Sequence, residues 1–187
     1  MEAVHTIDAA EKLLRHIGIN PGRLSLEWVS AAEAPRYVSI VTGFSERIRS
    51  LGPLGVSEGI AGEELGFRLR SAKALCQQEK FRWILGKKTE FSREGNVYGE
   101  IFSQHELGRL LEGLITEEFQ VQEILQLLEA GRLTVKELAL RLRLRPALVL
   151  RHVTVLCRRK LVELKEVKEG SPYYGLHLKG NGKEHGS

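Results

Sequence analysis

The feature that most constrains the fold is one short strand pattern near the N-terminus. Residues 24–29 read Leu-Ser-Leu-Glu-Trp-Val, and this alternation predicts a strand. Apolar residues at helical spacing predict a helix on each side, over residues 7–17 and 35–51, and Gly18 is placed to cap the C-terminal end of the first. One strand cannot form a sheet, because its backbone groups need a neighbouring strand. We therefore expect residues 1–53 to be the end of an alternating α/β domain whose other strands precede Met1 or belong to another polypeptide.

The same segment is expected to be poorly ordered without a partner. It has one strand, and each of its two helices is expected to leave an apolar face exposed. Residues 116–178, in contrast, are expected to fold alone, since their three helices can enclose a core.

The middle of the chain, residues 54–115, predicts a linker followed by helices. Residues 53–62 are rich in glycine and are typical of a linker. A helix is expected over residues 63–85, an irregular loop over 86–100, and a further helix from Ser103, where Glu106 completes a capping box. The expected helix over 63–85 places five side chains near one face: Leu65, Leu69, Ala72, Cys76 and Trp83.

The last third predicts a winged helix-turn-helix over residues 116–178. A helix ends at Gly131, and a capping box formed by Thr134 and Glu137 opens a second helix. Pro146 suits the first position of a third helix that runs to about Arg159. Residues 161–167 and 173–178 are expected to be the two strands of a hairpin. The fold class is therefore α+β and mostly helical, with a disordered tail over residues 179–187.

The positive charge of the chain gathers in this last module. The formal net charge is only +4, yet residues 141–160 hold seven basic side chains and no acidic one. In a helix-turn-helix the third helix faces the partner. The candidate contacts to a protein or nucleic acid are Arg145, Leu148, Arg151, His152, Arg158, Arg159 and Lys160.

The start of that third helix favours a protein partner over DNA. Residues 146–150 read Pro-Ala-Leu-Val-Leu and offer bases no donor or acceptor. We expect Leu148 or Val149 to be partly exposed and to dock on protein, while the basic residues give weak, salt-sensitive, non-specific DNA binding. Sequence-specific DNA recognition and a solvated basic face without a partner are the alternatives.

No catalytic constellation stands out in the sequence. The six histidines have no partner at metal-ligand spacing, and no phosphate-binding loop or nucleophile elbow occurs. Cys76 and Cys157 are apolar fillers on helix faces or redox thiols, and Arg158 beside Cys157 would lower its pKa if that thiol were exposed. The acidic N-terminus and the lack of a long apolar stretch suggest a soluble, reducing, cytoplasmic location.

Residues 13–33 and 44–53 carry a resemblance to a known family. With Leu-Glu-Trp-Val-Ser-Ala at 26–31 and Leu-Gly-Pro at 51–53, they resemble the C-terminal part of the delta, or iron-sulfur, subunit of methyl-viologen-reducing hydrogenase. Residues 81–86, 95–99 and the winged helix are similar to extensions that some members carry. The resemblance implies electron transfer, through a two-iron cluster, between a hydrogenase or another electron-donating enzyme and a heterodisulfide-reductase-type flavoprotein.

This chain departs from the family at the cluster. The family's cluster cysteines lie upstream of the matched region, and here no cysteine precedes Cys76, so no ligand can be transferred and no cofactor is expected in this chain. We expect a non-catalytic accessory or electron-transfer subunit, split or truncated, that binds other subunits of such a complex. The alternative is a winged-helix transcriptional regulator that binds DNA.

Overall fold

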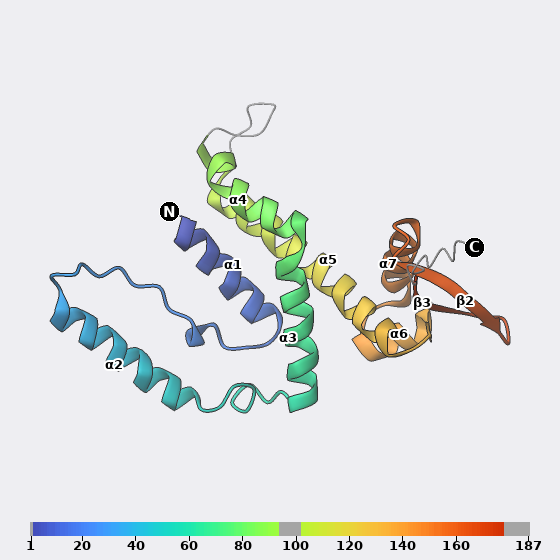
Figure 1. The fold of residues 1–187 in the computed structure, drawn as a ribbon, viewed down its shortest axis with the longest axis horizontal. Helices are drawn as coiled ribbons and strands as arrows, with labels where there is room; N and C mark the ends of the chain where they lie inside the picture. The colour runs from blue at the N-terminus through green and yellow to red at the C-terminus, as the bar shows by residue number, and fades with distance from the viewer. Residues whose placement is uncertain (1, 94–101, 178–187) are drawn as a thin grey trace, which may run out of the picture. The chain divides into compact units, whose positions relative to one another are not determined.

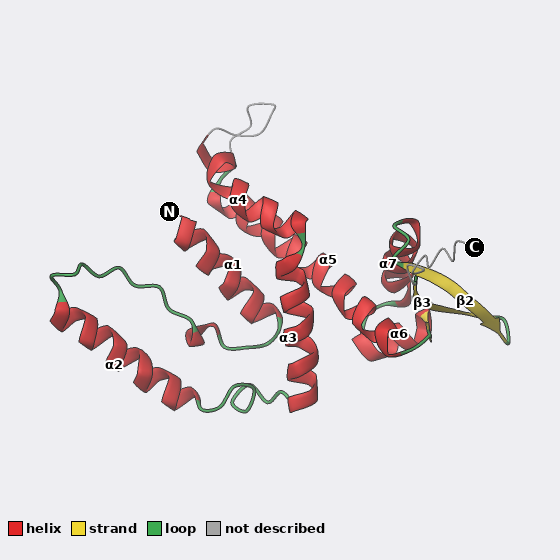
Figure 2. Cartoon of the chain, in the orientation of Figure 1, coloured by secondary structure: helices red, strands yellow, loops and turns green. Residues whose placement is uncertain are grey.

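The computed structural model describes residues 2–93 and 102–177. These residues form two compact units, residues 1–119 and residues 120–187. Figures 1 and 2 show that the first unit is helical and that the strands lie in the second. A mostly helical α+β fold is therefore confirmed.

The first unit is built from helices and one 3₁₀ turn. In the N-terminal segment α2 has nearly the predicted bounds, whereas α1 begins at Glu2, before the predicted start at residue 7. The last helix, α5, continues into the second unit (Figure 1). The elements are α1 (Glu2–His16), η1 (Pro21–Arg23), α2 (Ala34–Leu51), α3 (Gly62–Gln77), α4 (Glu79–Arg93) and α5 (Gln104–Ala130).

Helix α1 ends in the cap that its sequence predicts. Gly18 adopts a φ of 81°, a left-handed conformation that glycine reaches without strain. The amide of Ile19 donates to the carbonyl of Leu14 over 2.8 Å, and the amide of Gly18 donates to that of Arg15 over 3.1 Å. The chain thus turns sharply and brings Ile19 back into the core.

The predicted strand over residues 24–29 is wrong. This segment is extended but pairs with no strand among the residues that the structure describes. The reason is the one that the sequence raises: a sheet needs a second strand, and the described residues of unit 1 contain none.

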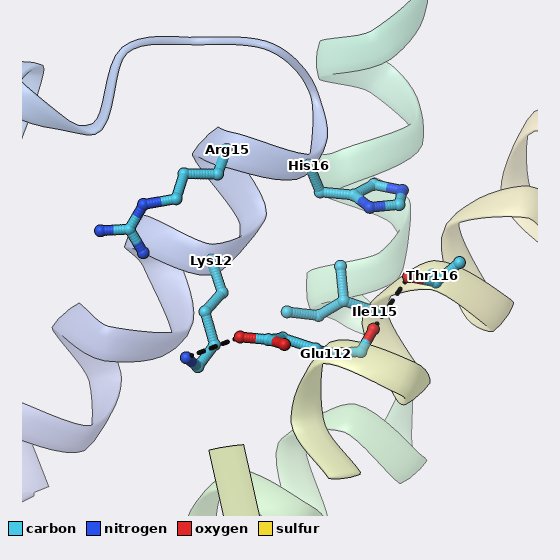
Figure 3. A pocket seen from close by; sticks show the side chains of 6 residues that line it. All are labelled: Lys12, Arg15, His16, Glu112, Ile115 and Thr116. Atoms are coloured by element: carbon cyan, nitrogen blue, oxygen red, sulfur yellow. Dashed lines mark hydrogen bonds and ion pairs between the residues drawn. The ribbon is translucent and has the colours of Figure 1, made fainter. Parts of the chain in front are cut away.

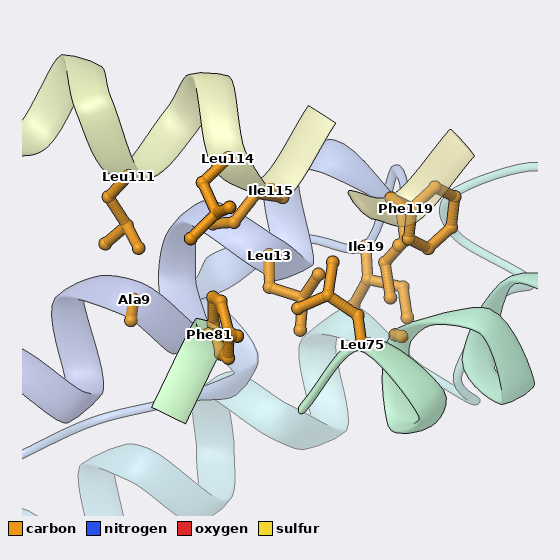
Figure 4. Close-up of a cluster of buried hydrophobic side chains, with 11 residues drawn as sticks. Ala9, Leu13, Ile19, Leu75, Phe81, Leu111, Leu114, Ile115 and Phe119 are labelled. Atoms are coloured by element: carbon orange, nitrogen blue, oxygen red, sulfur yellow. The ribbon is translucent and has the colours of Figure 1, made fainter. Parts of the chain in front are cut away.

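The core of the first unit gathers side chains from four helices. In Figure 4, Ala9 and Leu13 of α1 face Phe81 of α4 and Leu111 of α5. The expectation that both N-terminal helices leave an apolar face exposed is therefore wrong for α1. The buried cluster consists of Ala9, Leu13, Ile17, Ile19, Ala72, Leu75, Phe81, Leu111, Leu114, Ile115 and Phe119.

The expected helix over residues 63–85 is two helices. The chain breaks at Gln78, whose ψ of 132° is extended, and α4 then continues to Arg93. Residues 86–93 are therefore helical rather than looped, and residues 94–100 lie outside the described residues. Trp83, beyond the change of direction at Gln78, is 56% exposed, and Leu69 and Cys76 of α3 are also exposed. These three side chains therefore do not share the buried face of Ala72.

Residues 53–62 are a compact turn rather than an open linker. Gly55 is buried with a φ of 86°, and a Cβ there would lie 2.8 Å from a methyl group of Leu65. The amide of Ile60 donates to the carbonyl of Gly55 over 2.9 Å. Glycine is needed here both for its backbone conformation and for the close approach of Leu65.

The second unit has the element order expected from the sequence, with one short strand added. The capping box of Thr134 and Glu137 and the first-turn position of Pro146 are confirmed. The predicted helices before and after residue 116 are one continuous helix, α5. After α5 come β1 (Leu133–Thr134), α6 (Val135–Leu142), α7 (Pro146–Arg158), β2 (Val162–Lys168) and β3 (Ser171–Leu176).

The three strands form one small antiparallel sheet in the order β1-β3-β2. In this sheet Leu133 pairs with Tyr174, and Val162 pairs with Leu176. The sheet and helices enclose a second core, made of Ile124, Leu128, Leu133, Leu138, Ala139, Val149, Val153, Leu156 and Val162. No described helix is long and apolar enough to cross a bilayer.

Candidate interaction surfaces

Helix α2 is the least covered helix of the first unit. It contains no buried residue, although its apolar stripe is as regular as that of α1. The side chains of Tyr37 and Val38 are 58% and 61% exposed, and Val41 is 44% exposed. An amphipathic helix with an open apolar face indicates an interaction surface.

The extended segment before α2 carries a second exposed apolar group. Leu24 and Leu26 are half-buried, whereas Trp28 is 62% exposed. The segment ends where the amide of Ser30 donates to a carboxylate oxygen of Glu33 over 2.8 Å. Its remaining backbone groups pair with no strand of the described residues.

One arginine fastens the C-terminal end of α2. The Nε of Arg23 donates to Glu58 over 2.7 Å, and its terminal nitrogens donate to the carbonyls of Gly52, at 2.8 Å, and Leu51, at 3.1 Å. Both charged side chains are nearly covered, with 11% of Arg23 and 6% of Glu58 exposed. Arg23 thus satisfies carbonyls that a helix end leaves without partners, and we call this pair the Arg23–Glu58 clamp.

The clamp strongly lowers the pKa of the Glu58 carboxylate. The hydrogen bond from Arg23 is the largest cause that lowers the pKa of Glu58, to about 2. The amides of Asn20 and Gly55 also donate to this carboxylate, over 3.3 and 3.0 Å. Sequence reasoning missed the clamp because its partners lie 35 residues apart and no local pattern relates them.

A pocket of about 360 Å³ lies between α1 and α5 (Figure 3). Its cations are already paired: Lys12 reaches Glu112 at 3.0 Å and Asp8 at 3.3 Å, and Arg15 reaches Glu11 at 3.0 Å. Burial lowers the pKa of His16, whose ring packs edge-on against Phe119. The pocket therefore offers no uncompensated charge to an anionic ligand.

The sequence-predicted contacts of the second unit separate into exposed and buried groups. His152 is only 3% exposed, and its Nε2 lies 3.0 Å from the Oε1 of Gln120, so its ring is not presented to a partner in this structure. Leu148 is half-buried. The exposed cations are Arg145, Arg151, Arg158, Arg159 and Lys160, and none of them forms an ion pair with another described side chain.

The burial of His152 follows from helical spacing. Val149, His152, Val153 and Leu156 lie three or four residues apart and face the core together. The opposite face carries Leu150, which is 48% exposed. The expected exposure of Leu148 or Val149 is therefore met in part by Leu148, while Val149 is buried and Leu150 is the more exposed side chain.

The described residues do not fit an iron-sulfur cluster. The chain has two cysteines, Cys76 in the first unit and Cys157 in the second, whereas a cluster needs four thiolates or two with two histidines. No group of three or more metal-binding side chains occurs among the described residues. Desolvation raises the pKa of both thiols, so the lowering expected from Arg158 at Cys157 is not found.

Comparison with known proteins places a family likeness on the N-terminal segment. Residues 1–52 match the sequence profile of the methyl-viologen-reducing hydrogenase delta subunit. The chain is 44% identical over 48 residues to the iron-sulfur subunit of an F420-non-reducing hydrogenase from Methanopyrus kandleri. It is 38% identical over 52 residues to the corresponding iron-sulfur protein from Archaeoglobus profundus.

A similar segment occurs in a much larger protein. The chain is 33% identical over 54 residues to one of the subunits of the ferredoxin:CoB-CoM heterodisulfide reductase from Methanosarcina mazei. These matches cover 26–29% of this chain, 36% and 38% of the two hydrogenase proteins, and 7% of the reductase protein. No solved structure matches the chain significantly. The resemblance predicted from the sequence is therefore confirmed over residues 1–52, which match the methyl-viologen-reducing hydrogenase delta subunit family.

Proposed function

We propose that this chain is an accessory subunit of a hydrogenase or heterodisulfide-reductase-type oxidoreductase complex and acts through protein–protein contacts. Relatives of its first 52 residues are subunits of such enzymes. The observation that carries the proposal is that α2, inside the matched segment, buries none of its residues. An amphipathic helix whose apolar face is exposed is suited to bind the surface of a partner protein.

The partner in this proposal supplies a sheet edge and an apolar face. The extended segment over residues 24–29 adds to the edge of the partner's sheet, and this pairs backbone groups that no described strand satisfies. Trp28, Tyr37 and Val38 then bury their exposed side chains, and aromatic residues are enriched at such interfaces. The chain thereby completes an α/β domain together with the partner's strands.

Electron transfer through a cluster is assigned to the partner subunits. The family likeness is consistent with association with an iron-sulfur protein, but the ligands are not in the matched residues. Accordingly, the chain purified alone is expected to contain no stoichiometric iron or sulfide. Metal analysis with a visible absorption spectrum checks this, and stoichiometric iron in the isolated chain would contradict it.

The proposal is tested by reconstitution with separately purified hydrogenase and heterodisulfide reductase subunits from the same organism. Val38→Asp should weaken the complex at least about tenfold, which corresponds to ~1.4 kcal/mol, because a charge would enter the buried patch. Val167→Asp is the matched control, since Val167 of β2 is 60% exposed and Val38 is 61% exposed. Failure of every subunit to bind, or equal weakening by both variants, rejects the proposal.

Hydrogen exchange gives a second readout of the same complex. The amides of residues 25–29 should become protected on binding, since β-sheet addition pairs backbone groups. If the chain binds without that protection, its role in docking would stand, but the addition of residues 24–29 to the partner's sheet would be rejected.

A second candidate function rests on the exposed cations of the other unit. We propose that residues 116–178 are a winged-helix module, supported by its helix order and hairpin, and that its alternative role is DNA binding. The side chains of Arg145, Arg151 and Arg158 are exposed and unpaired within the described residues, as DNA contacts require. Titration against random and selected duplexes at physiological salt tests this role. One sequence bound about a thousandfold tighter than random DNA would establish a regulator.

A further inference from the structure

The second unit contains a groove of about 390 Å³ at the start of its last two helices. It lies where the first turn of α6, the first turn of α7 and the turn between β2 and β3 meet. We call it the hairpin groove. Most of its wall is apolar, formed by Val135, Pro146, Ala147, Leu150, Pro172 and Tyr174.

The groove is bordered by positive charge. Lys136 is part of its wall, and Arg145 and Arg151 directly flank Pro146 and Leu150 in the chain. All three cations are exposed, and none pairs with a carboxylate among the described residues. The nearby acid Glu137 is already engaged, because its carboxylate accepts from the amide and hydroxyl of Thr134.

From this combination we propose that the hairpin groove binds an acidic protein segment that carries one apolar anchor side chain. The anchor seats against Leu150, whose side chain is 48% exposed, and carboxylates on either side of it meet Lys136, Arg145 and Arg151. The charge on the rim favours an anionic partner, and the apolar wall favours an apolar side chain, which a bare anion lacks.

The same surface is poorly equipped to recognise bases. The first turn of α7 has no hydrogen-bonding side chain, and the hydroxyl of Thr154 donates back to the carbonyl of Leu150 over 2.7 Å. Base edges are distinguished by donors and acceptors, and on this face only the flanking cations supply donors while the apolar wall supplies none. An acidic peptide uses both the wall and the rim, and the inference stands on this unit without depending on the proposed subunit role.

Selection from a random dodecapeptide display library on the immobilised full-length chain tests the proposal. Enriched peptides should combine Asp or Glu with one aliphatic or aromatic residue. Enrichment of neutral or basic peptides, or no enrichment at all, would overturn the proposal. The best peptide is then synthesised with a fluorophore and titrated by anisotropy, together with two analogues that replace the anchor by Ala or the acids by Gln. Both analogues should bind at least about fivefold more weakly, because each loses one half of the recognition.

Substitutions in the chain locate the site. Leu150→Ala should weaken the peptide at least about fivefold, while Leu140→Ala should leave binding unchanged. Leu140 is a matched control because it is an exposed leucine, at 80%, on α6 and outside the groove. Equal effects of the two substitutions overturn the proposal.

The charge test separates a local site from a general attraction. Arg151→Glu should weaken the peptide at least about fivefold more than Arg158→Glu. The two arginines lie seven residues apart on α7, a rise of ~10 Å, which exceeds the screening length of about 8 Å at physiological salt. Equal effects of the two charge reversals contradict a local site. Displacement of the peptide by a random duplex at equal concentration assigns the surface to nucleic acid instead.

Discussion

Helices α1 and α2 have similar amphipathic patterns, but only α1 buries its apolar face within the chain. Both belong to the segment matched by the hydrogenase delta subunit family. Ala9 and Leu13 of α1, and Ile17 directly after it, are buried among α3, α4 and α5, whereas α2 buries no residue. Apolar periodicity therefore tells which face of a helix will be covered, but it does not tell whether the same chain covers it.

The difference lies in how each helix is attached. Helix α1 is held along its length by packing, while the C-terminal end of α2 is fixed by the Arg23–Glu58 clamp. Packing contributes stability in proportion to apolar area, and the clamp acts at one point. Perturbations of the two helices should therefore differ in size, from a large loss of stability in α1 to almost none on the open face of α2.

Truncation of the core side chain that directly follows α1 should have the largest effect. Ile17 is 2% exposed, and Ile17→Ala is expected to cost about 2–5 kcal/mol in the free energy of unfolding, through lost burial and the cavity left behind. Urea denaturation followed by tryptophan fluorescence measures this, because both tryptophans, Trp28 and Trp83, belong to the first unit. A loss below ~0.5 kcal/mol would show that α1 is not part of the folded core.

Removal of the clamp should release α2 without unfolding α1. Arg23→Met removes the guanidinium donor from the carboxylate of Glu58 and from the carbonyls of Leu51 and Gly52. Amide exchange in the C-terminal half of α2 should therefore accelerate while exchange in α1 stays slow. Arg36→Met is the control, because Arg36 forms only an exposed pair with Glu33 and should change little. If the two variants exchange alike, the clamp does not hold α2.

Acid should weaken the clamp in a defined range of pH. The pKa of Glu58 is lowered from 4.5 to about 2 in the folded chain, so its stabilising contribution is complete above about pH 4.5 and disappears as the pH falls towards 2. The amide of Gly55 donates to this carboxylate and reports its protonation in an NMR titration. We expect a midpoint near 2 that moves up towards 4.5 in Arg23→Met. A midpoint near 4.5 in the unaltered chain contradicts the clamp.

The smallest effect is expected on the open face of α2. Val41 is 44% exposed, so Val41→Ala should change the free energy of unfolding by less than ~0.5 kcal/mol. The same urea experiment that measures Ile17→Ala gives this value. A cost comparable to that of Ile17→Ala would mean that this face is covered within the chain, and the contrast between the two helices would fail.

Local chemistry in the sequence predicts much of this fold. The capping boxes at Ser103 and Thr134, the proline start of α7 and the glycine end of α1 all depend on residues within a few positions of each other. Each is specified by backbone donors and acceptors that a neighbouring side chain satisfies. These features are found where the sequence predicts them.

The features that the sequence does not predict depend on contacts between distant residues. The break at Gln78 carries no proline or glycine signal, and the strand over residues 24–29 fails because no described strand lies beside it. The helical pattern of α7 identifies which of its faces points inward. The choice of candidate contacts by basic residue type instead places His152 on the surface, whereas the structure places it against Gln120. The candidate surfaces are predictable as segments, but their exposed side chains require the tertiary structure.

The Arg23–Glu58 clamp also determines where this protein can be divided. The family match ends at residue 52, yet Arg23, inside the match, is held by Glu58, outside it. A cut at residue 52 would leave the guanidinium group of Arg23 without its carboxylate partner. It would also remove the turn in which the amide of Ile60 donates to the carbonyl of Gly55. The shortest segment that keeps the clamp and its turn intact therefore extends through residue 60, so the segment recognised by sequence similarity is shorter than the segment that anchors α2.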